Sequence, residues 1–127
     1  MAEAHPVHAL VVDGANVVGS RPDGWWRDRP GAARRLWERL DASVLAYDEV
    51  VLVLEGAARA GVPAGSRGDV LTVHATRSGD DAVVEQTRHR RGAGSDVTVV
   101  TADRGLRARV EAEGGTVVGP AWLLAAT

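Results

Sequence analysis

Short apolar runs alternate with longer amphipathic stretches along the chain. Each run consists mainly of Val, Leu or Ala, and four of the five stop abruptly at an acidic residue, a glycine or a threonine. Continuous runs of this length are typical of strands that are buried on both faces of a sheet. The pattern predicts five strands, at His8–Val12, Val50–Leu54, Val70–Val73, Val97–Val100 and Thr116–Val118.

The stretches between the strands favour helices. Apolar residues from Ala33 to Leu45 recur at helical spacing after Pro30, a residue suited to a first turn. A second stretch has acids at its start and arginines at its end, which suits the helix dipole. The predicted helices are Gly31–Tyr47, Asp80 or Asp81 to Arg91, Asp103–Glu113 and Pro120–Ala126, and the Gly- and Arg-rich stretch Gly56–Gly68 is predicted to be a mobile loop.

Strands that alternate with helices predict a parallel sheet covered on both faces. We therefore expect a three-layer α/β/α sandwich with a mostly parallel sheet of about five strands. A length of 127 residues suits one domain, residues 1–127, and residues 1–6 are expected to form a loose N-terminus.

Composition excludes several kinds of chemistry. The chain has no Cys, which removes disulfides, thiolate nucleophiles and Cys-based metal sites, and all 15 residues counted as Lys+Arg are arginines. Without Lys there is no Walker A loop and no Schiff-base chemistry. The first apolar run is too short for a signal peptide and no segment could span a membrane, so we expect a cytoplasmic protein.

Carboxylates follow the predicted strands with unusual regularity. In open α/β sheets, ligands bind beyond the carboxyl ends of the strands. A cluster of acids there repels itself unless cations or protons neutralise it, and Mg²⁺ or Mn²⁺ with oxygen ligands would do so. Such an ion activates water for phosphodiester hydrolysis. The acids that could converge are Asp13, Glu55, Asp80, Asp81, Glu85 and Asp103.

Each acid also has a simpler explanation. Asp80 and Asp103 stand where helices begin, and an Asp at that position is most often an N-cap. Asp13 is harder to explain in this way because it directly ends a strand and precedes Gly14. His74 lies near the end of the third predicted strand, and we favour a structural or surface role for it.

Charge and aromatic residues point to a possible binding surface. Removing Asp13, Asp80, Asp81, Glu85 and Asp103 from the net charge of −2 leaves +3 for the rest of the chain. Arginines that flank aromatic residues are typical of single-stranded RNA platforms. The alternative is that a Trp packs under the loop and the arginines are solvated or pair with Asp23 and Asp28. The candidate substrate-binding residues are Arg21, Trp25, Trp26, Arg27 and Arg104.

Three motifs follow one another along the chain, at Val11–Val17, Gly79–Glu85 and Val99–Arg104. In this order they resemble the opening D-G-x-N signature, the helix-borne acid and the T/S-x-D strand end of the NYN domains, which are PIN-like metal-dependent ribonucleases. Residues 20–30 match nothing general in the family.

The resemblance implies a PIN-like sheet of order 3-2-1-4-5 and endoribonuclease chemistry. It implies that Asp13, Asp81 and Asp103 bind metal, with Asp81 preferred to Asp80 and Glu85 as a further acid. Asn16 would orient a ligand or a metal-bound water, and Thr101 would contact that water or a phosphate. The implied catalytic set is Asp13, Asn16, Asp81, Thr101 and Asp103.

Three functions therefore stay open. The leading hypothesis is an endoribonuclease that hydrolyses RNA phosphodiesters with water activated at an Mg²⁺ or Mn²⁺ site. The second is a phosphohydrolase acting on a small nucleotide, which a tight pocket closed by the Trp25–Trp26 loop would favour. The third is a non-catalytic domain that binds RNA or a protein partner, favoured if the acids do not converge or pair with Arg104. RNA is the expected partner, and a homodimer is left open.

Overall fold

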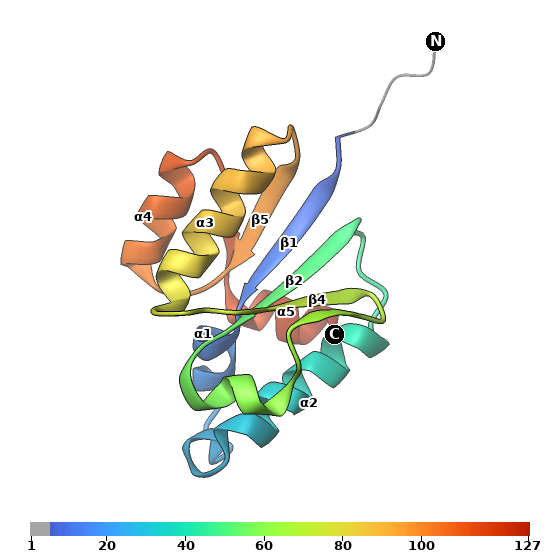
Figure 1. Cartoon of the computed structure of the whole chain (residues 1–127), viewed down its shortest axis with the longest axis vertical. Helices are drawn as coiled ribbons and strands as arrows, with labels where there is room; N and C mark the ends of the chain where they lie inside the picture. The colour runs from blue at the N-terminus through green and yellow to red at the C-terminus, as the bar shows by residue number, and fades with distance from the viewer. Residues whose placement is uncertain (1–5) are drawn as a thin grey trace.

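The structure is a computed structural model that describes residues 6–127. The expected loose N-terminus, residues 1–6, lies outside the described residues except for Pro6. Strands and helices alternate along the chain as the pattern predicts (Figure 1). The strands are β1 (His8–Asp13), β2 (Glu49–Leu54), β3 (Gly65–Arg67), β4 (Val70–His74), β5 (Asp96–Val100) and β6 (Thr116–Val118). The helices are α1 (Gly14–Gly19), α2 (Arg29–Ala42), α3 (Gly79–Gly92), α4 (Arg104–Ala112) and α5 (Pro120–Ala126), with 3₁₀ turns η1 (Trp25–Arg27) and η2 (Gly56–Gly61).

The sheet has the order β3-β4-β2-β1-β5-β6. All neighbours from β4 to β6 pair in parallel, which confirms the mostly parallel sheet and its predicted order for the five strands identified in the sequence. The sixth strand, β3, was not predicted. It pairs antiparallel with β4 at the edge of the sheet.

Helices cover both faces of the sheet and create two cores. On one face α1, α2 and α5 bury Leu10, Leu52 and Leu123 together with other apolar side chains. On the other face α3 and α4 pack over Val11, Val99 and further apolar side chains. Figure 1 shows α3 and α4 side by side, apart from α1, α2 and α5. No helix in residues 6–127 has the length and apolar character needed to cross a membrane.

The structure differs from the sequence prediction at the end of one helix and in one predicted loop. The helix predicted to reach Tyr47 ends at Ala42, because Ser43 turns to an extended backbone and its N–H donates to the Leu40 carbonyl. Val44, predicted to lie on the apolar face, is 99% exposed. The predicted mobile loop Gly56–Gly68 contains η2 and β3.

His74 has the structural role favoured above, since its Nε2 lies 2.7 Å from the Val62 carbonyl oxygen.

The sequence pattern did not predict α1, whose first residue packs unusually close to the sheet. A Cβ on Gly14 would lie 2.6 Å from the backbone oxygen of Val53 and 2.9 Å from Leu54 Cδ2. Backbone cannot move aside cheaply, so only glycine lets the chain turn into α1 directly after β1.

We expect Gly14→Ala to lower the free energy of unfolding by about 1–3 kcal/mol, the usual cost of overpacking a core. Urea denaturation would measure the loss. Gly19→Ala is the matched control in the same helix, because its Cβ would make only an ordinary contact, 3.8 Å from Trp25 Cζ2. Equal effects of the two substitutions would contradict the close-packing explanation.

Candidate functional site

The candidate site lies where the parallel strands of the sheet end. Asp13 is the last residue of β1, the strand between β2 and β5. Glu55 follows β2, Asp103 lies just before α4, and Asp80 is in the first turn of α3. The crossovers of a parallel sheet bring all four to the carboxyl edge, where α/β proteins bind ligands.

Asp13 is buried at the centre of this edge, with 4% of its surface exposed. Its Oδ2 accepts a hydrogen bond of 2.9 Å from the Thr101 hydroxyl, and its Oδ1 accepts one of 3.4 Å from the Asn16 N–H. Burial raises the pKa of Asp13 above its ordinary value and outweighs these two hydrogen bonds, which lower it. The negative charges of Asp80 and Glu55 raise this pKa further.

Two polar side chains hold the ends of β1 and β5 together. The Thr101 hydroxyl donates to Asp13 and accepts a hydrogen bond of 3.2 Å from the Asp103 N–H. Asn16 Oδ1 accepts a hydrogen bond of 2.7 Å from the Ala102 N–H. The two residues that the resemblance places at the site therefore fix its geometry, and direct contact with metal-bound water or phosphate stays a prediction for both.

The structure favours Asp80 over Asp81 as a member of the site, whereas the resemblance implied Asp81. Burial and the negative charges of Asp103 and Glu55 raise the pKa of Asp80, so Asp80 belongs to the carboxylate cluster. Asp81 is exposed, and its Oδ1 accepts a hydrogen bond of 2.8 Å from Arg109 Nη2. This ion pair holds the pKa of Asp81 below its ordinary value. Neighbours in a helix point about 100° apart, and here only the first of them faces the other acids.

Glu85, the further acid implied by the resemblance, also lies away from the cluster. It is exposed one turn further along α3, where it borders a shallow hollow together with Asp81 and Gln86. We therefore define the acidic cluster as Asp13, Glu55, Asp80 and Asp103.

The capping interpretation holds for Asp103 and is wrong for Asp80. Asp103 Oδ1 accepts a hydrogen bond of 2.9 Å from the Leu106 N–H and so caps α4. The cap of α3 is Ser78, whose hydroxyl accepts from the Asp81 N–H. Helix capping therefore does not explain the presence of an acid at Asp80.

Glu55 was left out of the implied ligand set, yet it connects two parts of the site. Its Oε2 accepts a hydrogen bond of 2.9 Å from the Gly79 N–H, the first residue of α3. A Cβ on Gly79 would lie 3.0 Å from Glu55 Oε1, so the glycine allows this close approach. The position of Glu55 directly after β2 was the signal that could have included it.

The cluster fits a hard divalent cation by the chemistry of its donors. All four side chains are carboxylates, and burial, with mutual repulsion added to it, raises the pKa of both Asp13 and Asp80. Within residues 6–127, no three His, Asp or Glu side chains are close enough to enclose an ion by themselves. Mg²⁺ commonly takes one or two carboxylates and keeps several water ligands, so a site of this kind does not require a closed cage.

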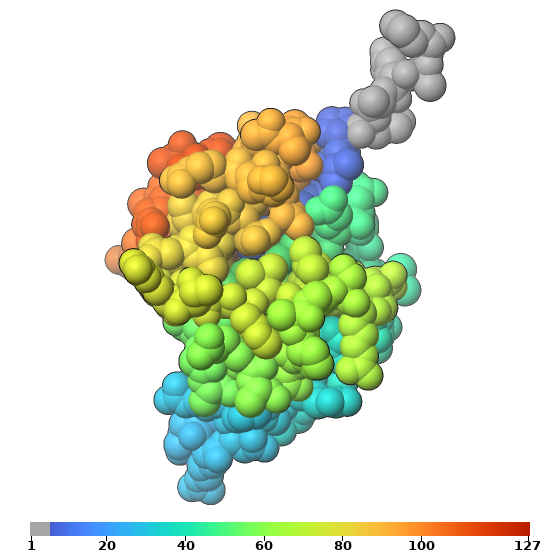
Figure 2. Space-filling view, viewed as in Figure 1, coloured from blue at the N-terminus to red at the C-terminus, as the bar shows by residue number. Residues whose placement is uncertain are grey.

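The loop that follows α1 places its predicted RNA-binding residues differently. Trp25 is half-buried, and its ring lies 5.2 Å from the guanidinium carbon of Arg29. Trp26 is 52% exposed, with Arg27 5.9 Å from its ring. Figure 2 shows this segment, in blue, at one end of the molecule. Trp25 is therefore partly packed under the loop, as the alternative proposed, and it also lines a pocket, while Trp26 faces solvent.

Two predicted substrate-binding arginines lie apart from Trp25. Arg21 borders a hollow of about 290 Å³ between α1 and α2, together with Arg35 and Arg39. Arg104 is exposed in the first turn of α4, and among residues 6–127 it makes no ion pair. One of the two arrangements that would favour a non-catalytic domain, acids locked by Arg104, is therefore absent from this part of the chain. The other, incomplete convergence of Asp13, Asp81 and Asp103, is present, because Asp81 is paired with Arg109 instead.

Sequence comparison finds no matching family model and no matching curated protein. The fold, however, has a solved counterpart. It is similar to the crystal structure of a mutant of Rae1 (YacP) from Bacillus subtilis, with a TM-score of 0.70, over 94% of this chain and 74% of that chain. The two sequences are 17% identical. At this identity the likeness establishes the shared fold alone, and it confirms the predicted α/β class.

The raised carboxylate pKa values predict how the metal-free protein responds to pH. A carboxyl group whose pKa is higher in the folded state binds more protons folded than unfolded, so stability falls as pH rises from about 3.8 to the raised value. We expect Asp80→Asn to remove this loss, so that its stability relative to wild type grows across that window. Urea unfolding in EDTA between pH 4 and pH 7 measures the difference, and parallel curves for the two proteins would contradict it.

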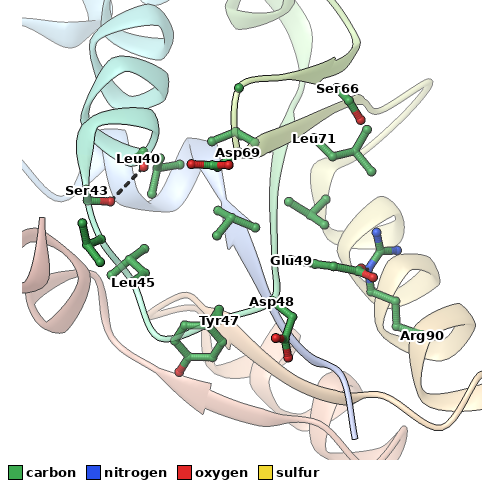
Figure 3. A pocket seen from close by; sticks show the side chains of 15 residues that line it. Leu40, Ser43, Leu45, Tyr47, Asp48, Glu49, Ser66, Asp69, Leu71 and Arg90 are labelled. Carbon is green, nitrogen blue, oxygen red and sulfur yellow. Dashed lines mark hydrogen bonds and ion pairs between the residues drawn. The ribbon is translucent and has the colours of Figure 1, made fainter. Parts of the chain in front are cut away.

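A larger cavity, of about 600 Å³, lies at the opposite end of the sheet (Figure 3). It is bordered by the end of α2 and the starts of β2 and β4. Its carboxylates Asp48, Glu49 and Asp69 disfavour an anionic ligand, and the Glu49 Oε2 lies 3.1 Å from Arg90 Nε. This cavity is remote from the acidic cluster, so it does not enlarge the candidate site.

Proposed function

We propose that this protein is a metal-dependent endoribonuclease. The observation that carries the proposal is Asp13, a buried carboxylate at the carboxyl end of β1 whose pKa is raised by burial and by the charges of Asp80 and Glu55. Asp13 caps α1 and accepts a hydrogen bond from Thr101, but burial outweighs both hydrogen bonds and destabilises the charged carboxylate. Perturbed carboxylates of this kind mark functional sites. The resemblance to NYN domains over the surrounding motif supplies the reaction class.

Asp13, together with Asp80 or Asp103, would hold Mg²⁺ or Mn²⁺, and water would complete the coordination. When bound, the ion supplies an activated water and neutralises charge on the phosphate. The protein groups have separate tasks. Thr101 and Asn16 keep Asp13 and the β5 end in register, and Glu55 fixes the start of α3 and thereby the position of Asp80.

RNA is the proposed substrate because cationic and aromatic groups lie near the acids. Trp25, Arg29 and Arg77 border a pocket that Glu55 also borders. Guanidinium groups bind phosphate oxygens, and aromatic rings stack on unpaired bases.

A small-nucleotide phosphohydrolase is the second candidate, favoured by the same pocket. Its volume of about 330 Å³ is at the lower end for small-molecule sites. The two candidates differ in the bond that is broken, which is an internal phosphodiester in the first and a terminal phosphate ester in the second.

One experiment tests both candidates. Isothermal titration calorimetry with Mn²⁺ and with Mg²⁺ is run beside two assays, cleavage of a 5′-labelled single-stranded RNA and release of phosphate from nucleoside monophosphates. We expect metal binding, and RNA fragments with either metal that disappear in EDTA. Phosphate release without internal RNA cleavage would favour the phosphohydrolase. Failure to bind either metal at millimolar concentration, with or without RNA, would overturn both.

A further inference from the structure

The pocket beside the acidic cluster has features that the metal site does not need. Its walls include Ala15, Trp25, Leu54, Glu55, Ala58 and Arg77. These residues come from α1, η1, the end of β2, η2 and the loop before α3. The pocket is therefore built by segments far apart in the sequence, with an aromatic wall, apolar walls and charged groups at its border.

Trp25 forms the aromatic wall and is held in place on two sides. Arg29 stacks on its ring at 5.2 Å, and Trp26 meets it edge to face at 5.9 Å between ring centroids. Trp25 also lies against the end of α1, since a Cβ on Gly19 would be 3.8 Å from its Cζ2. A ring fixed in this way loses little conformational freedom when a flat ligand stacks on it.

Two arginines at the pocket, Arg29 and Arg77, could donate hydrogen bonds to a ligand. Within residues 6–127, neither Arg29 nor Arg77 takes part in an ion pair with an acid. The positive charge of Arg77 nevertheless lowers the pKa of Asp81, which places it near the start of α3. Guanidinium groups free of carboxylates suit the carbonyl oxygens and ring nitrogens of a nucleobase, or its phosphate.

The pocket and the acidic cluster share a border. Glu55 lines the pocket, and its charge also raises the pKa of Asp13 and of Asp80. Gly14, the next residue after Asp13, lines it as well. A group seated in the pocket is thus a near neighbour of a phosphate bound at Asp13.

We propose that this pocket binds a single unpaired nucleobase of the RNA, that of a nucleotide adjoining the cleaved phosphate. The base stacks on Trp25, and Arg29 and Arg77 donate hydrogen bonds to it or to its phosphate. This inference rests on the proposed ribonuclease function for its position in the reaction, but base binding itself requires neither metal nor cleavage.

Indole NMR signals test base binding directly. The chain has four Trp residues, so a ¹⁵N-labelled sample gives up to four indole N–H signals, which Trp25→Leu and Trp122→Leu assign. The protein is titrated in EDTA with each of the four nucleoside 5′-monophosphates and with ribose 5-phosphate. We expect the Trp25 signal to move in a saturable way with at least one nucleotide, while the Trp122 signal stays in place. An unmoved Trp25 signal, or an equal shift with ribose 5-phosphate, would overturn the proposal.

Substitutions extend the test to RNA binding. Stacking of one base is worth about tenfold in affinity, so Trp25→Leu should weaken binding of a single-stranded RNA in EDTA by about that factor. Trp25→Phe, which keeps an aromatic ring, should recover most of the loss. Arg77→Gln should also weaken binding, and its matched control is Arg34→Gln, a residue paired with Glu38 on α2. Unchanged affinity in Trp25→Leu and Arg77→Gln would overturn the proposal.

The two hypotheses fail in different ways. If the Trp25 signal responds to nucleotides but RNA is not cleaved, the pocket stands and the ribonuclease function falls. If RNA is cleaved but Trp25→Leu cleaves and binds it as wild type does, the ribonuclease function stands and the pocket proposal falls.

Discussion

Asp13→Asn should reduce metal-dependent RNA cleavage by more than about 100-fold and remove measurable binding of Mn²⁺. Loss of an outer-shell partner of a metal ligand already costs 10- to 100-fold, so loss of a central ligand should cost more. Asn retains the size of Asp and an oxygen that can accept from the Thr101 hydroxyl, which now bonds to Asp13 at 2.9 Å. Calorimetry and the labelled-RNA assay measure the two effects.

The matched control for this substitution is Asp96→Asn. Asp96 is the first residue of β5, at the end of that strand opposite to the acidic cluster, and it pairs with exposed Arg91. Its substitution should leave cleavage within about twofold of wild type. Metal-dependent cleavage that survives in Asp13→Asn would place the reaction at other residues and would contradict the site proposed above.

Asp80→Asn and Asp81→Asn should separate two adjacent acids. Asp80 faces the other carboxylates, so its removal should weaken metal binding by about 10- to 100-fold. This is at least the loss expected when an outer-shell partner of a metal ligand is removed. Asp81 is exposed and paired with Arg109, so its removal should change metal affinity less than threefold. Titrations of both variants with Mn²⁺, under the same conditions, measure the difference.

Arg109→Gln distinguishes this arrangement from one in which Asp81 turns inward. If Asp81 were a ligand held away by its ion pair, freeing it would strengthen metal binding. The structure predicts only a small change in metal affinity instead, because removal of Arg109 changes the charge near Asp80 without supplying a new ligand. Tighter metal binding in Arg109→Gln, together with weaker binding in Asp81→Asn, would reverse the assignment.

The sheet could be predicted because its signal is repeated along the chain. Buried parallel strands need apolar side chains on both faces. Short apolar runs such as Val50–Leu54 and Val97–Val100 therefore predict such strands directly. β3 has no such signal, since Gly65, Ser66 and Arg67 are all exposed and only their pairing with β4 makes them a strand. α1 is six residues long, too short for a helical period to show.

The candidate site was predictable by position and not by orientation. Asp13 and Asp103 follow strands, and the sheet topology alone brings such residues to one edge. The choice between Asp80 and Asp81 depends on how α3 is rotated about its axis and on Arg109, which is 28 residues further along the chain. The pocket beside Trp25 is lined by six segments, and no local sequence pattern indicates that these segments come together.

The edges of the sheet limit how two copies of this chain could associate. Both outer strands, β3 and β6, are three residues long, so each offers few unpaired backbone groups to a strand from another molecule. β4 has a Val-rich sequence and would readily pair with a strand of another molecule if it were the outer strand. Its free side is instead paired with β3. A homodimer built on residues 6–127 would therefore have to use helical surfaces rather than a continuous intermolecular sheet. Removing residues 65–67 would expose the backbone groups of β4 and so favour aggregation through this edge of the sheet.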